Sequence, residues 1–154
     1  GWLYVEEPLI AAGYRVTVWD ALGSGRSGKP SDGDYSLEAH LHRLERVLDE
    51  LGVAAPTLIG HSLGGALALR FACAHPERTK ALCLIDPAAY REGATDGRWL
   101  WDVPLLAEIV LGVLSTEMLV DLALAQNFAD PERIPADLRR LFLREAHRKG
   151  AIAA

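Results

Sequence analysis

The sequence predicts an α/β fold, in which a doubly wound, mostly parallel sheet is followed by a helical segment. Helix-like and strand-like patterns alternate over residues 2–86, as in half of a doubly wound domain with right-handed crossovers. The strand-like run at 80–86 is apolar throughout, as in a parallel sheet covered on both faces. After about residue 90 only helical patterns remain.

Composition excludes several classes of protein. The chain has 154 residues, of which 50% are hydrophobic, enough for a core that offsets the entropy of ordering. Two cysteines exclude a disulfide-rich scaffold. Lys and Arg number 16 against 21 Asp and Glu, so the net charge of −5 argues against a nucleic-acid partner.

The first elements are predicted from hydrophobic periodicity and from residues that begin or end helices and strands. Residues 2–12 predict a helix that ends at Gly13, and the β-branched and aromatic run at 14–20 predicts a strand. A loop rich in Gly, Ser and Pro follows at 21–34. Ser36 is the expected N-cap of a helix that Gly52 stops.

The next elements are more apolar. Residues 56–60 predict a short strand, and residues 66–74 predict a helix that is apolar on nearly all sides and therefore buried. Cys73 and Cys83 lie in apolar patterns, so we expect buried thiols in a reducing, cytoplasmic compartment.

Helices are predicted at 99–114, 116–126 and 136–148, with Asp130-Pro131 as a helix start. We therefore expect residues 1–92 to form a partial core of three βα units and residues 93–154 to form a helical cap. The longest apolar run, 103–114, is interrupted and falls short of the roughly 20 residues that span a bilayer, so no membrane insertion is expected.

One motif carries chemistry. Gly60-His61-Ser62-Leu63-Gly64 matches G-x-S-x-G between a strand and a buried helix. The chain must reverse sharply there, and we expect a side chain at Gly60 or Gly64 to collide with the turn. Ser62 would project its hydroxyl at a helix N-terminus, where the backbone N–H of Leu63 would stabilise a developing oxyanion.

Together with Gly65, the 19–27 loop, Tyr35-Ser36-Leu37 and Leu84-Ile85-Asp86-Pro87, this motif resembles the α/β-hydrolase superfamily. The resemblance implies a partial α/β-hydrolase fold and a serine hydrolase without cofactors. Ser62 would attack a carbonyl to give an acyl-enzyme that water hydrolyses. A serine rather than an aspartate nucleophile disfavours dehalogenases and epoxide hydrolases. Esterase, lipase-like, thioesterase, C–C bond hydrolase and perhydrolase activities stay open.

The other catalytic parts of that family are not found. His61 adjoins Ser62 but should point away from it; His40, His42 and His75 are expected to be solvent-facing or at helix ends, and His147 lies in the last predicted helix. Asp86 follows a strand, where some members carry the acid, although a strand-end turn is the simpler interpretation. We therefore expect a fragment lacking both ends that is inactive alone.

The sequence also allows three other interpretations to be considered. Gly23 to Gly28 match the dinucleotide pattern G-x-G-x-x-G, but residues 29–33 cannot open the required helix. A non-catalytic ligand-binding protein of the same fold is the second. No spacing suits a metal. Apolar residues of the expected cap would cover a small hydrophobic ester-type substrate or pack on the core: Trp99, Trp101, Leu105, Leu106, Ile109, Val110, Leu114, Met118 and Phe128.

Overall fold

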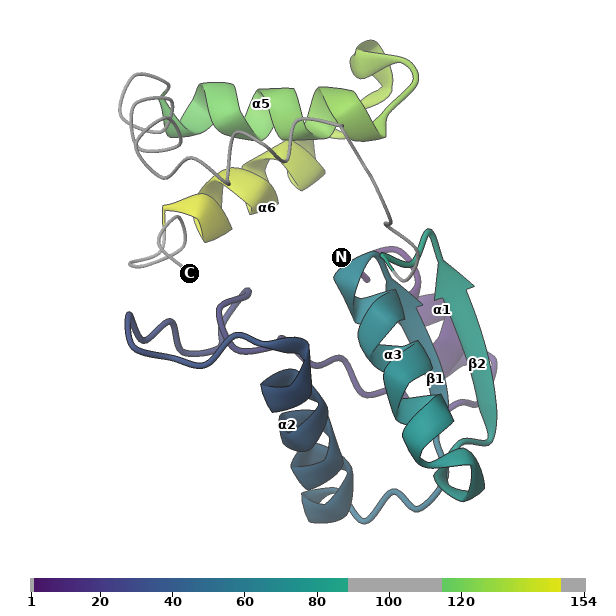
Figure 1. Cartoon of the computed structure of the whole chain (residues 1–154). Coiled ribbons are helices and arrows are strands. Elements are labelled where there is room, and N and C mark those ends of the chain that lie inside the picture. Colours follow the sequence, from purple (N-terminus) through teal and green to yellow (C-terminus); the bar gives the residue numbers. More distant parts are fainter. Residues whose placement is uncertain (1, 89–114, 148–154) are drawn as a thin grey trace.

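A computed structural model of the chain describes residues 2–88 and 115–147 (Figure 1). Its helices are α1 (Glu6–Ala11), α2 (Leu37–Glu50), α3 (Leu63–Ala74), α5 (Thr116–Asn127) and α6 (Ala136–Ala146), and its strands are β1 (Thr57–His61) and β2 (Ala81–Ile85). Short 3-10 turns follow at Pro76–Arg78 and Pro131–Arg133.

The two strands are parallel, with Thr57 opposite Ala81 and His61 opposite Ile85. Helix α3 connects them and lies against the sheet (Figure 1), which confirms a parallel α/β arrangement. The expectation that both faces of 80–86 are covered is wrong within the described residues. Ala81, Cys83 and Ile85 are exposed, because α3 covers only one face of β2.

The strand predicted at 14–20 is also absent. These residues carry no strand or bridge assignment, and among the described residues only β1 and β2 form a sheet. The β-branched run supplies propensity, but a strand exists only where a neighbouring backbone completes its hydrogen bonds. Trp19 from this segment packs against the hydrophobic core instead. The described part therefore holds two of the three strands expected in residues 1–92.

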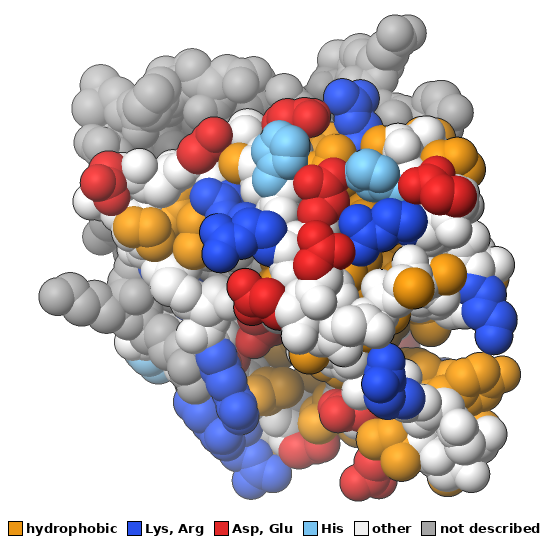
Figure 2. All heavy atoms as spheres, turned by 90° about the horizontal axis from the view of Figure 1, so that it is seen from below, with side chains coloured by type: hydrophobic (Ala, Val, Ile, Leu, Met, Phe, Trp, Pro, Cys, Tyr) orange, Lys and Arg blue, Asp and Glu red, His pale blue; other side chains and the backbone are white. Residues whose placement is uncertain are grey.

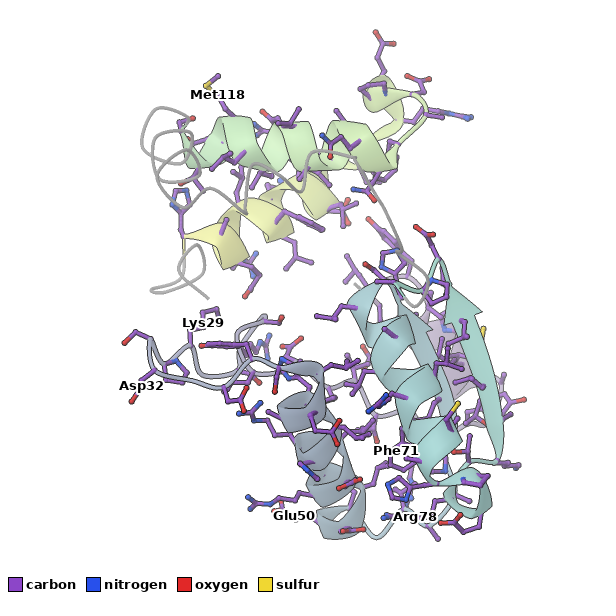
Figure 3. The ribbon with its side chains drawn as sticks, in the orientation of Figure 1. Lys29, Asp32, Glu50, Phe71, Arg78 and Met118 are labelled. Atoms are coloured by element: carbon purple, nitrogen blue, oxygen red, sulfur yellow. The ribbon has the colours of Figure 1, made fainter. Side chains whose placement is uncertain are left out.

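The core lies between α2 and α3. Ser36 caps α2 by accepting a hydrogen bond from the Ala39 N–H at 3.2 Å, and Gly52 follows the helix with φ +63°, so the predicted helix is confirmed. Its apolar stripe meets Phe71 of α3, which is fully buried (Figure 3). The core cluster comprises Leu41, Leu44, Leu48, Leu67 and Phe71.

Ion pairs surround this core. Glu45 of α2 accepts from His75 at 2.6 Å, Asp49 from Arg78 at 2.6 Å, and Glu38 from Arg70 at 3.3 Å. Figure 2 shows acidic, basic and histidine side chains gathered on one face of the molecule. The three ion pairs join α2 to α3 and to the 3-10 turn that follows α3. They therefore help to hold these two helices together.

Two further expectations about burial are wrong. His40 is 4% exposed, because it shares the stripe of α2 that carries Leu41, Leu44 and Leu48 to the core. Cys73 and Cys83 are exposed, because each lies on the side of its element that nothing in the described part covers. The apolar residues that flank these positions in the sequence do not show which face of a helix or strand is buried.

Helices α5 and α6 pack together, with Val120 and Leu124 buried. Arg139 binds Asp121 with two hydrogen bonds of 2.6 and 2.8 Å. The helix start predicted at Asp130-Pro131 is confirmed, for the short 3-10 helix Pro131–Arg133: the Asp130 carboxylate caps it by accepting from the Glu132 N–H at 3.1 Å. The helix predicted at 99–114 and the 92/93 boundary lie outside the described residues. In the part that is described, no helix is long and apolar enough to cross a membrane.

Candidate active site

Ser62 occupies a strained turn between β1 and α3. It directly follows the last residue of β1, precedes the first residue of α3, and has φ +52° and ψ −121°. This is the left-handed region that non-glycine residues rarely adopt, and such a residue costs about 1–3 kcal/mol. The surrounding structure must therefore hold the serine in place.

Four backbone hydrogen bonds hold it. The Ser62 N–H donates to the Ile85 carbonyl at 3.1 Å, at the end of β2. The Ser62 carbonyl accepts from Gly65 at 2.9 Å and Ala66 at 3.1 Å, in the first turn of α3, and from Ala88 at 3.0 Å. The serine backbone is thus bound by its own helix, by the last residue of β2 and by Ala88 just after that strand.

Close backbone packing explains two of the glycines. A Cβ on Gly60 would lie 2.6 Å from the carbonyl carbon of Gly64 and 2.7 Å from the Gly65 Cα. A Cβ on Gly65 would lie 2.8 Å from the Cβ of Pro87. The collision expected at Gly60 is confirmed, and Gly65 is a second constrained position.

The collision expected at Gly64 is wrong. A Cβ there would meet no described atom within 4 Å. Gly64 is the obstacle that a side chain at Gly60 would strike, while its own Cβ direction is open. The pattern G-x-S-x-G does not reveal this difference between the two glycines, because it gives their spacing but not the direction in which a Cβ on each would point.

The helix end beside Ser62 offers hydrogen-bond donors. Leu63 is the first residue of α3, and neither its N–H nor that of Gly64 donates to an acceptor within the described residues. Such N–H groups at a helix N-terminus favour an anion. An oxygen that gains negative charge next to Ser62 would therefore find a donor at Leu63.

Among the described residues, none provides a base that contacts the Ser62 side chain. Within residues 2–88 and 115–147, the Ser62 hydroxyl has no hydrogen-bond partner. His61 is exposed at the end of β1, and His147 lies 3.5 Å from Glu117. His42 and His75 both contact Glu45, and these hydrogen bonds, with that of His42 the larger, lower the pKa of the Glu45 carboxyl.

Asp86 directly follows β2 and is exposed. Its φ is +42°, and its carboxylate has no hydrogen bond with any described residue. The structure therefore brings together the 60–65 turn and the residues around Asp86, and among the described residues neither the Ser62 hydroxyl nor the Asp86 carboxylate is hydrogen-bonded to a histidine. The left-handed backbone at Asp86 is a feature that sequence reasoning missed, since Asp-Pro suggests a turn without giving its conformation.

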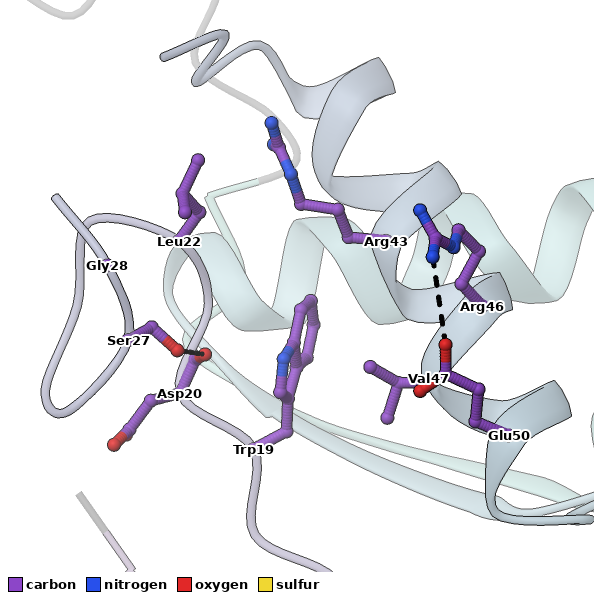
Figure 4. Close-up of a pocket in the computed structure, with 9 residues that line it drawn as sticks. All are labelled: Trp19, Asp20, Leu22, Ser27, Gly28, Arg43, Arg46, Val47 and Glu50. Atoms are coloured by element: carbon purple, nitrogen blue, oxygen red, sulfur yellow. Dashed lines mark hydrogen bonds and ion pairs between the residues drawn. The ribbon is translucent and has the colours of Figure 1, made fainter. Parts of the chain in front are cut away.

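A separate hollow lies between the 19–28 loop and α2 (Figure 4). Its lining residues are Trp19, Asp20, Leu22, Ser27, Gly28, Arg43, Arg46, Val47 and Glu50. The loop closes on itself, with Gly23 donating to the Gly28 carbonyl at 2.9 Å, and the next helix begins only at Leu37. The dinucleotide fingerprint needs a helix that opens at its third glycine, so the structure disfavours that alternative.

Comparisons with known proteins identify the family and the fold of the chain. A family model described as alpha/beta hydrolase fold matches residues 1–130. Lipase 3 of Moraxella sp. (strain TA144) is 34% identical over 99 residues, covering 61% of this chain and 31% of that protein. 2-Hydroxymuconate semialdehyde hydrolase of Pseudomonas sp. (strain CF600) is 37% identical over 90 residues, covering 58% and 32%. The chain spans about a third of the length of these curated relatives.

A solved structure shows the same fold. The meta-cleavage product hydrolase from Pseudomonas fluorescens IP01 matches with a TM-score of 0.68 at 21% identity. The match covers 87% of this chain and 47% of that one. At this identity the likeness concerns the fold alone.

Proposed function

Because this chain belongs to the α/β hydrolase fold family, we propose that the natural protein carrying it is a serine hydrolase with Ser62 as its nucleophile. The observation that carries the proposal is the left-handed backbone of Ser62 at the junction of β1 and α3. Strain of this kind persists only where neighbouring contacts enforce it, and it concentrates at functional residues. Here those contacts are backbone hydrogen bonds to Ile85 and Ala88.

The proposed chemistry follows from the surroundings of Ser62. Its Oγ attacks the carbonyl carbon of a substrate and forms a tetrahedral intermediate whose oxygen carries negative charge. The Leu63 N–H, at the N-terminus of α3, donates to that oxygen. The intermediate collapses to an acyl-enzyme as the leaving group departs with a proton, and water then releases the acid. Within the described residues we assign the base to no side chain.

The proposed substrate is a small hydrophobic ester or a related acyl compound. The lipase among the relatives supports an ester substrate by its name, whereas the name of the 2-hydroxymuconate semialdehyde hydrolase supports hydrolysis only. We also propose that residues 93–154 form a helical cap over the core. In that segment Met118 is exposed and Phe128 half-buried, so both could offer apolar contact to a substrate.

Ester turnover tests the proposed function. The natural protein would be assayed with p-nitrophenyl esters of increasing acyl length, beside the Ser62→Ala variant. We expect hydrolysis that the variant loses by at least about a thousandfold, since the nucleophile itself is removed. Tight binding of the esters without turnover, equal in both proteins, would instead indicate the non-catalytic ligand-binding alternative.

A further inference from the structure

The residues on either side of Asp86, at the end of β2 and just after it, bind the backbone of Ser62. The Ile85 carbonyl, one residue before Asp86, accepts the Ser62 N–H at 3.1 Å. The Ala88 N–H, two residues after Asp86, donates to the Ser62 carbonyl at 3.0 Å. Both backbone polar groups of Ser62 are therefore bound by one short segment of chain.

That segment also fills the space beside the glycines. Pro87 lies where a side chain at Gly65 would be, because a Cβ built there would be 2.8 Å from the Pro87 Cβ. Gly65 in turn donates to the Ser62 carbonyl at 2.9 Å. The segment thus contacts the serine directly and also the residue that closes the first turn of α3.

These two hydrogen bonds to Ser62 depend on an unusual backbone conformation. Ser62 and Asp86 are the non-glycine residues with positive φ in the described part of the chain, at +52° and +42°. A left-handed residue redirects the chain within one step, so that Ile85 and Ala88 both face Ser62. Aspartate tolerates this region better than most residues, and β-branched residues tolerate it least.

We propose that Asp86 is a positioning residue, which holds Ser62 in place through its left-handed backbone and not through its carboxylate. The exposed carboxylate, without a hydrogen-bond partner among the described residues, agrees with this assignment. The inference rests on the proposed function, in which Ser62 is the nucleophile. It differs from the role of catalytic acid, which would need the carboxylate itself.

Three variants of Asp86 in the natural protein separate the two roles. Asp86→Asn and Asp86→Gly keep access to the left-handed region and remove the charge, whereas Asp86→Val makes that region costly. The measured quantity is the second-order rate at which a fluorophosphonate probe labels Ser62. We expect the labelling rates of Asp86→Asn and Asp86→Gly to stay within roughly threefold of the parent rate, with an unchanged pH profile. The labelling rate of Asp86→Val should fall by roughly tenfold or more.

A fourth variant and a second readout keep the inference testable if Asp86→Val does not fold. Ala88→Pro leaves the Asp86 carboxylate intact but removes the backbone N–H that donates to the Ser62 carbonyl. It should therefore lower the labelling rate of Ser62 as Asp86→Val does. Amide hydrogen exchange at Ser62 should quicken in Asp86→Val and Ala88→Pro, and stay at the parent rate in Asp86→Asn and Asp86→Gly.

The outcomes for the inference and for the proposed function are distinct. Loss of labelling in Asp86→Asn and Asp86→Gly as large as in Asp86→Val would overturn the inference in favour of a catalytic carboxylate. Parent-like labelling and exchange in a folded Asp86→Val would overturn it as well. A parent protein that is never labelled at Ser62, with the expected exchange pattern, would refute the proposed nucleophile while supporting the backbone role of Asp86.

Discussion

Gly60 and Gly64 pack backbone against backbone, so closely that a Cβ on Gly60 would lie 2.6 Å from the carbonyl carbon of Gly64. The contact is one-sided, because a Cβ on Gly64 would meet no described atom within 4 Å. It joins the end of β1 to the first turn of α3 and thereby sets the sharpness of the turn that carries Ser62.

Alanine substitutions should reproduce this asymmetry. Gly60→Ala forces two backbone segments apart and should lower the free energy of unfolding by about 1–3 kcal/mol or more, as overpacking does. Gly64→Ala places alanine inside α3 and should be neutral or raise it by up to about 1 kcal/mol through helix propensity. Urea unfolding of both variants measures the difference, and equal destabilisation would contradict the steric explanation.

The sequence predicted local features, such as helix caps, better than it predicted which faces of the helices and strands are buried. Helix α2 could be predicted with its Ser36 cap, because capping and periodicity are local properties. The strand at 14–20 could not, because a strand needs a neighbouring backbone that propensity does not supply. The burial of His40 and the exposure of Cys83 likewise depend on which elements pack together.

At the site, the position of Ser62 followed from the motif and its flanking elements. The openness around Gly64, the constraint on Gly65 and the conformation of Asp86 did not, since each depends on the three-dimensional path of the chain after β2. Spacing along the sequence identifies which residues meet at a turn but not the direction in which their side chains point.

Glu45 should make stability depend on pH. It accepts hydrogen bonds from His42 at 3.1 Å and His75 at 2.6 Å, which lower the pKa of its carboxyl below 4.5. Its stabilising contribution is therefore present above pH 4.5 and lost as the pH falls through the folded-state pKa. Glu45→Gln should lower the free energy of unfolding by about 1 kcal/mol near neutral pH.

Denaturant unfolding of Glu45→Gln at several pH values measures this contribution. The difference from the parent should shrink as the pH falls well below 4.5. Glu38→Gln is the matched control, since its pair with Arg70 is more than half exposed on both sides and should contribute less than about 0.5 kcal/mol. A constant difference at all pH values would refute the assignment to the ionised carboxylate.

His40 should act in a higher pH range. Burial, followed by the nearby charge of Arg43, lowers the pKa of its imidazole below 6.5, while Asp34 raises it. As the pH falls, His40 is therefore protonated in the unfolded chain before it is protonated in the folded one. The stability that the neutral His40 contributes should be fully present above pH 6.5 and should decline as the pH falls below 6.5. His40→Leu removes this proton uptake, so the decline that begins below pH 6.5 should flatten.

Free energies of unfolding of the parent and His40→Leu, measured across that pH range, provide the comparison. Curves that stay parallel through the range would show that His40 does not titrate differently in the folded and unfolded states.

Leu63 is proposed to act through its backbone N–H. The residue is 56% exposed, so Leu63→Ala should change the free energy of unfolding by no more than about 0.5 kcal/mol. Because alanine keeps the N–H at the start of α3, the rate of ester hydrolysis in the natural protein should stay within roughly tenfold of the parent. A loss as large as that of Ser62→Ala would show that the leucine side chain is itself required.

Labelling by a fluorophosphonate probe tests the role of Ser62 most directly. The natural protein and its Ser62→Ala variant would be treated with the probe, and the modified peptide would be located by mass spectrometry. A single adduct on Ser62, absent from a folded Ser62→Ala variant, is the result predicted for an activated nucleophile. A folded parent protein that forms no adduct, or an adduct carried by another residue, would contradict it.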